Sequence, residues 1–119
     1  MRRLAFALLT TLLFAGAGGQ AHAAEIDASL IAAAKKEGRV TFYTPLIVDQ
    51  IARPLTAAFS KKYGIQADFL RMDSDAVVLR ILNEYRAKKG AADVFTTSLG
   101  IQALTKSGAA RKFKTVSAD

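Results

Sequence analysis

The side chains best suited to hold a ligand are hydroxyls that follow three strand-like segments of the chain. They are Thr44, Ser74, Thr97 and Ser98. A hydroxyl donates one hydrogen bond and accepts two, and free N–H groups at the start of a following helix add a positive partial charge. This combination favours a small anion, or the carboxylate or phosphate end of a small ligand. Plain helix capping is the alternative for Ser74 and Ser98, because serine is a favoured N-cap residue.

Two residue types that carry much of enzyme chemistry are scarce. The chain of 119 residues has no Cys, and its one histidine is His22. Disulfides, thiolate metal sites and Cys nucleophiles are therefore excluded. If His22 is removed with an export signal, no residue is left for a Ser-His-Asp triad or a His-ligated zinc site. Oxygen ligands remain, and they suit hard ions such as ferric iron or calcium.

The first 23 residues are typical of an export signal. Arg2 and Arg3 precede an uncharged, mostly apolar stretch at 4–17, and Ala21-His22-Ala23 is a small-x-small cleavage site. The apolar stretch is shorter than the roughly 20 residues that span a bilayer. We expect residues 1–23 to be a signal peptide cleaved after Ala23, which predicts a periplasmic protein that does not bind nucleic acid. An uncleaved membrane anchor is the alternative.

Helix-like and strand-like segments alternate after the signal. Val, Phe and Tyr mark the strands, while apolar residues three and four apart, followed by Gly, mark the helices. Pro54 interrupts the second helix and predicts a kink or a fresh start near Arg53. The expected helices are 27–37, 48–63, 75–88 and 99–107, the expected strands are 40–43, 65–70 and 93–96, and a further short strand is open within 111–119.

Strands separated by helices of this length predict βαβ units, right-handed crossovers and a parallel sheet. Since the carboxyl ends of parallel strands share one edge, we expect Thr44, Ser74, Thr97 and Ser98 to meet at a single rim. Three strands make a thin sheet, so residues 24–119 are predicted to be the opening part of a larger α/β lobe. Asp73 and Asp75 flank Ser74 and would repel an anion unless one of them turns outward.

Four runs of sequence are similar to the periplasmic substrate-binding proteins of ABC transporters. The runs are EGRVTFYTPL at 37–46, FSKKYGIQADFLR at 59–71, DSDAVVLRIL at 73–82 and AADVFTTS at 91–98. The chain resembles the ferric-iron- and anion-binding branch of this extracellular solute-binding family. The resemblance implies a two-lobed type II periplasmic-binding-protein fold, of which residues 24–119, after the signal helix, form the N-terminal part of lobe 1, with the second lobe absent.

The resemblance also implies a function. The chain would be the solute-binding component of an importer, binding ferric iron or a small anionic solute and delivering it to an ABC permease in the inner membrane. It would catalyse no reaction, need no cofactor and be a monomer when full length. Tyr43 matches a metal-ligand position, whereas Ile47 and Ser98 stand where iron-binding relatives often have His and Glu. The segments of Ser74 and of Thr97 and Ser98 match the edge of the ligand cleft.

Two other functions stay open. A secreted α/β enzyme is one, although neither a Gly-x-Ser-x-Gly elbow nor a Gly-rich phosphate loop occurs. A ligand-sensing domain of the same fold is the other, but the sequence shows no helix-turn-helix, and an export signal does not suit a DNA-bound regulator.

Overall fold

The computed structural model of the chain describes residues 26–113 and 115, and in them helices and strands alternate as predicted. The expected signal peptide lies outside the described residues, as does most of the expected strand near the C-terminus. Residues 111–113 and 115 form neither helix nor strand. The elements in chain order are α1 (Ala28–Glu37), β1 (Arg39–Thr44), η1 (Val48–Ala52), α2 (Arg53–Tyr63), β2 (Gln66–Arg71), α3 (Ser74–Arg86), β3 (Val94–Phe95) and α4 (Ile101–Ser107).

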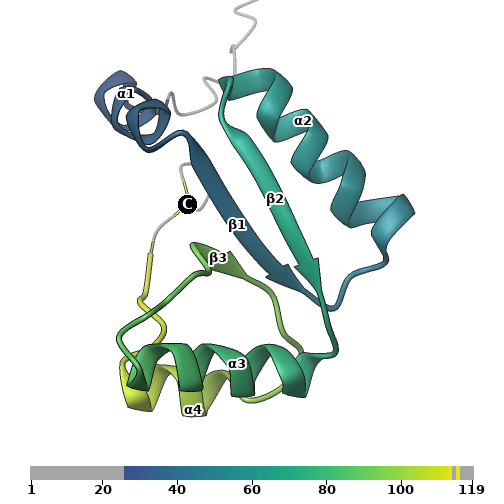
Figure 1. Ribbon diagram of the computed structural model, residues 1–119, viewed down its shortest axis with the longest axis vertical. Helices are drawn as coiled ribbons and strands as arrows, with labels where there is room; N and C mark the ends of the chain where they lie inside the picture. The colour runs from purple at the N-terminus through teal and green to yellow at the C-terminus, as the bar shows by residue number, and fades with distance from the viewer. Residues whose placement is uncertain (1–25, 114, 116–119) are drawn as a thin grey trace, which may run out of the picture.

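The three strands form one parallel sheet in the order β2-β1-β3, which confirms the predicted α/β arrangement. The chain runs from β1 outward to β2, then returns past β1 to β3 (Figure 1). Right-handed crossovers in these two directions place α2 and α3 on opposite faces of the sheet. The reversal of strand order falls at β1, so the carboxyl ends of β1 and β3 form a switch point, where α/β sheets commonly bind ligands.

The second helix starts afresh at its proline. The turn η1 has wide π-type hydrogen bonding, in which the Ala52 N–H donates to the Ile47 carbonyl at 3.1 Å. Pro54 is then the second residue of α2, where its missing N–H costs nothing because the first helical N–H groups have no partner in their own helix. The predicted break near Arg53 is therefore confirmed as two consecutive helical segments.

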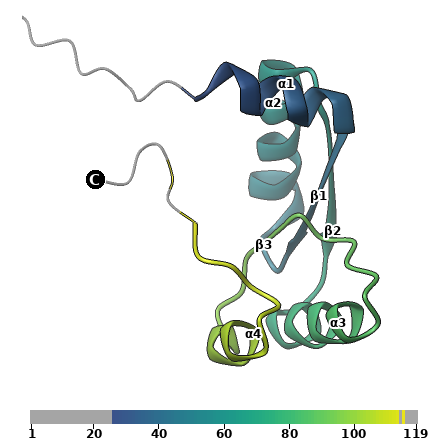
Figure 2. The same ribbon diagram turned by 90° about the vertical axis from the view of Figure 1, so that its left-hand side faces the viewer.

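The hydrophobic core is small and lies between β1, α3 and α4. Its buried side chains are Tyr43, Val77, Ile81 and Leu104, with partly buried neighbours around them. Figure 2 shows α3 and α4 side by side at the end of the molecule opposite α1. Many large apolar side chains remain exposed, among them Leu30, Ile47, Leu55, Leu79, Leu99 and Ile101. Among the described residues, none of the helices combines the length and apolar character that crossing a bilayer requires.

Two local expectations need correction. The helix α4 begins at Ile101 after Gly100, which has a φ of 70°, instead of at Leu99 after a Ser98 cap. Asp73, and not Ser74, occupies the N-cap position of α3, so Ser74 is the first helical residue. Tyr85, on α3, is about half exposed at 49% and lies outside the buried core.

Candidate ligand-binding rim

A pair of threonine hydroxyls joins the carboxyl ends of β1 and β3. The Thr44 and Thr96 Oγ1 atoms lie 2.8 Å apart, and the Leu46 N–H donates to Thr44 Oγ1 at 3.1 Å. The Met72 N–H, just past β2, donates to the Thr44 carbonyl at 3.1 Å. The ends of all three strands are thus tied together at Thr44, as the parallel sheet predicted. The Thr44 side chain itself has no exposed surface, so it stabilises the strand ends and does not face the solvent.

A pair of serine hydroxyls lies above these strand ends. Ser74 Oγ and Ser98 Oγ are 2.9 Å apart, and the Ser98 N–H donates to Ser74 Oγ at 3.2 Å. The two hydroxyls carry two protons and use one in their mutual bond, so one proton is left for another acceptor. Ser98 is exposed and Ser74 half-buried. This serine pair is therefore the part of the rim that a ligand from solution can reach.

Thr97 shapes the turn that carries Ser98. Its Oγ1 accepts from the Leu99 N–H at 3.2 Å and lies within donating distance of the Leu99 carbonyl at 2.8 Å and the Ser74 carbonyl at 3.3 Å. These bonds hold residues 97–99 against the start of α3, 23 residues away in sequence. Thr44, Ser74, Thr97 and Ser98 consequently gather at one edge of the sheet, in two layers.

The aspartates beside Ser74 have partners of their own. Asp73 Oδ1 forms an ion pair with Arg71 Nη2 at 3.2 Å, and Asp75 Oδ1 accepts from the backbone N–H of Ala76 at 3.0 Å. Both carboxylates are exposed, and water screens their charge. The Arg71 guanidinium lies at the end of β2 and offsets one of the two negative charges, which lessens the repulsion that the sequence predicted for an anion.

The Tyr43 side chain points from β1 toward α3 and away from the rim hydroxyls. It is 2% exposed, and its hydroxyl donates to Glu84 Oε1 at 2.9 Å and accepts from Arg80 Nε at 3.2 Å. The same carboxylate accepts from Arg80 Nε at 2.8 Å and, through Oε2, from the Ala91 N–H at 3.1 Å. The phenol proposed as a metal ligand therefore belongs to a polar network that fastens β1 to α3.

The pKa values in this network follow from its contacts. Burial, and then the hydrogen bond to Glu84, raise the pKa of Tyr43. Burial alone would raise the pKa of Glu84, but the hydrogen bonds from Ala91, Tyr43 and Arg80 outweigh it and hold that pKa below its ordinary value. Tyr43 is thus neutral and Glu84 ionised near pH 7, which is the pairing their hydrogen bonds require.

Sequence reasoning placed Thr96 at the end of a strand without making it a site residue, and it missed Arg80 and Glu84. The i,i+4 spacing of Arg80 and Glu84 is a local signal for an ion pair. No local signal indicates that Glu84 meets Tyr43 across 41 positions or that Thr96 meets Thr44 across 52. Over the part of the chain that the structure describes, no three or more Asp, Glu, His or Cys side chains gather in a way that could hold a metal ion. Two shallow pockets of about 320 and 340 Å³ lie elsewhere, one beside Glu84 and Tyr85 and the other between α2 and β2.

A scan against protein-family models, a search of the curated proteins and a search of the solved structures each returned no match for this chain.

Proposed function

We propose that this chain forms part of one lobe of a periplasmic solute-binding protein, which carries a small anion to an ABC permease in the inner membrane. Three features support this: the expected export signal, the four family-like runs of the sequence and the β2-β1-β3 parallel sheet. Binding would consist of closing two lobes of a type II fold on the solute, with no covalent chemistry, in a protein that is monomeric when full length.

The observation that carries the proposal is the contact between Ser74 Oγ and Ser98 Oγ at 2.9 Å. Two loops that are 24 residues apart in sequence present their hydroxyls together, at the edge where α/β sheets bind ligands. The α3 helix starts at Ser74, so its first backbone N–H groups and its positive dipole end lie beside the pair. The Ala76 N–H already donates to Asp75 Oδ1, so the donors that an anion can use are the spare hydroxyl proton and the N–H groups of Ser74 and Asp75 at the start of α3.

Of the two cargoes that the resemblance implies, the contacts favour a small anion over ferric iron. Tyr43, the iron-ligand candidate, already donates to Glu84 and accepts from Arg80, and its side chain is buried. The serine pair offers hydrogen-bond donors, which phosphate or a phosphonate requires, while the nearby carboxylates of Asp73 and Asp75 have Arg71 and the Ala76 N–H as partners.

The test is equilibrium dialysis of the purified protein against phosphate, methylphosphonate and ferric citrate. We expect one of the two phosphorus anions to bind, and Ser74→Ala to weaken that binding about tenfold, since a hydrogen bond to a charged group contributes roughly 1.5 kcal/mol or more. The matched control is Thr105→Ala, which deletes an exposed hydroxyl that bonds only to carbonyls of its own helix. The rim is not the site if none of the three ligands binds at millimolar concentration, or if Ser74→Ala and Thr105→Ala lose the same amount of binding affinity.

A further inference from the structure

The end of the molecule opposite the rim carries a cluster of positive charge. Figures 1 and 2 show α1 and the end of α2 at the opposite end of the strands from α3 and α4. The Gln66 N–H, just past α2, donates to the carbonyl of Gly38, just past α1, at 3.1 Å. The last turns of both helices therefore converge. We name as the basic end the five cations gathered there, Lys35, Lys36, Arg39, Lys61 and Lys62.

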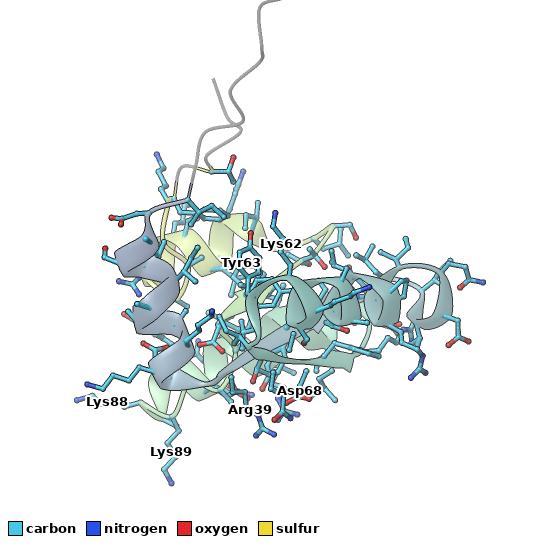
Figure 3. The ribbon with its side chains drawn as sticks, turned by 90° about the horizontal axis from the view of Figure 1, so that it is seen from above. Arg39, Lys62, Tyr63, Asp68, Lys88 and Lys89 are labelled. Atoms are coloured by element: carbon cyan, nitrogen blue, oxygen red, sulfur yellow. The ribbon has the colours of Figure 1, made fainter. Side chains whose placement is uncertain are left out.

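Negative charge offsets only part of the basic end. Asp68 pairs with Arg39 at 2.9 Å, as Figure 3 shows, and Glu37 is the other carboxylate on these segments. The carbonyl ends of two helices add about one further negative charge. Within the described residues every salt bridge is made by an arginine, so the four lysines have no carboxylate partner. A net charge of about two remains, on long and exposed side chains.

The helix α1 adds apolar surface beside this charge. None of its residues is buried, and Leu30 is 62% exposed although the helix is mostly alanine, leucine and isoleucine. At the end of α2, the Tyr63 ring packs against Phe59 at a tilt of 51° with ring centroids 4.9 Å apart, and Lys62 Nζ lies 5.3 Å from the Tyr63 ring centre. An unburied apolar helix face with lysines at its end and an aromatic ring nearby is typical of segments that lie at a membrane interface.

We propose that the basic end, together with the exposed face of α1, is a contact surface for a bilayer of anionic phospholipid. A lipid surface fits better than an acidic protein, because the lysines lie on flexible stems without fixed partners. Such charges match a diffuse layer of headgroups and not a set of carboxylates in fixed positions. The inference is independent of the rim, which faces the other way and keeps its access to solute.

The test is co-sedimentation of the protein with lipid vesicles. The full sequence is expressed in an exporting bacterial host, and the soluble product is mixed with phosphatidylcholine vesicles with or without about one third phosphatidylglycerol. We expect binding to the anionic vesicles only, and release in about 0.5 M salt, where the Debye length is roughly 4 Å. Lys61→Gln combined with Lys62→Gln should raise the lipid concentration for half-binding about tenfold or more, since each basic residue near the surface contributes roughly fivefold.

The matched control changes the same number of charges elsewhere. Lys88 and Lys89 follow α3, and Figure 3 shows them projecting on a different side from Lys62. Lys88→Gln with Lys89→Gln should leave vesicle binding within about twofold of the parent, because charges beyond a Debye length are screened. Leu30→Gln should weaken binding without changing its salt dependence.

Three results would overturn the proposal. An equal loss of vesicle binding in the Lys61/Lys62 and the Lys88/Lys89 double variants would mean that total charge alone drives binding. Equal binding to neutral vesicles, or binding that survives high salt, would mean apolar insertion without the basic end. Binding to soluble polyglutamate that is tighter, at the same charge concentration, than binding to the anionic vesicles would assign the surface to an acidic polymer instead of a bilayer.

Discussion

Replacing Glu84 by alanine tests the network that fastens β1 to α3. The carboxylate accepts hydrogen bonds from three segments of the chain: the Tyr43 hydroxyl at 2.9 Å, Arg80 Nε at 2.8 Å and the Ala91 N–H at 3.1 Å. Only the first donor belongs to a fully buried residue. We therefore expect Glu84→Ala to lower the free energy of unfolding, mainly because the Tyr43 hydroxyl is left without an acceptor inside the core.

The size of the effect follows from how exposed each donor is. An unsatisfied buried hydroxyl costs about 1–3 kcal/mol. Arg80 is nearly half exposed and turns to water, so its share is below about 1 kcal/mol. The Ala91 N–H is exposed and loses almost nothing. The sum is a loss of about 1–4 kcal/mol in the free energy of unfolding, or a fall of roughly 5–30 °C in Tm for a unit of this size.

A double-mutant cycle with Tyr43→Phe separates this reason from a general loss of packing. In the Glu84→Ala background, Tyr43→Phe removes the stranded hydroxyl, so it should cost nothing or restore stability. The expected coupling, from urea unfolding followed by circular dichroism, is about 1–2 kcal/mol. Additive losses, within about 0.5 kcal/mol, would refute the network. Asp49→Ala is the control, because its carboxylate is 79% exposed and pairs with Arg53 on the surface.

The network also sets a pH dependence. Glu84 has a lowered pKa in the folded state, so its contribution is present above the ordinary pKa of a glutamate and is lost as the pH falls through the folded value. Tyr43 has a raised pKa, so its contribution is present below the ordinary pKa of a tyrosine and is lost as the pH rises through the folded value. The difference in stability between the parent and Glu84→Ala should therefore shrink in acid.

Two further substitutions probe the packing beneath the rim. Leu104→Ala removes a side chain with no exposed surface from the small core and should cost about 2–5 kcal/mol in urea unfolding. Gly100→Ala places a Cβ 2.9 Å from a methyl group of Val78 at a φ of 70°, so it should destabilise more than Gly64→Ala, where φ is similarly positive but nothing lies within 4 Å. Equal losses at the two glycines in thermal melts would contradict the contact with Val78.

The sequence predicted the parts of this fold that local chemistry determines. Gly38 and Gly64 end their helices with φ values of 79° and 67°, a conformation that glycine adopts without strain. Pro54 predicted the new start at Arg53 because a proline lacks the N–H that an unbroken helix needs there. The parallel sheet followed from helices long enough to cross between strands.

The structure departs from the prediction where a side chain or backbone N–H forms a hydrogen bond with a residue distant in sequence, although local patterns predict a partner within its own helix or strand. Ser98 does not cap α4, because its Oγ pairs with Ser74 Oγ and α4 begins only after Gly100. The strand β3 is shorter than predicted, because the Asp93 carboxylate accepts from the Thr41 N–H at 2.8 Å. No single-sequence pattern reports a partner 24 or 52 residues away.

Tyr43 and Thr44, the last two residues of β1, connect this strand to α3 and to the end of β3. Successive side chains of a strand point to opposite faces, so Tyr43 reaches α3 through Glu84, while Thr44 joins Thr96 across the strand ends. Because Ser74 begins α3 and Ser98 follows Thr96, each serine of the rim is anchored through one of these two residues. The serine pair is held from both sides of the sheet, so its geometry depends on the packing of α3 as much as on the loops that carry it. A loss of ligand binding in Ser74→Ala with unchanged stability would thus locate the effect at the hydroxyl itself, whereas a loss in Glu84→Ala would reach the rim only through α3.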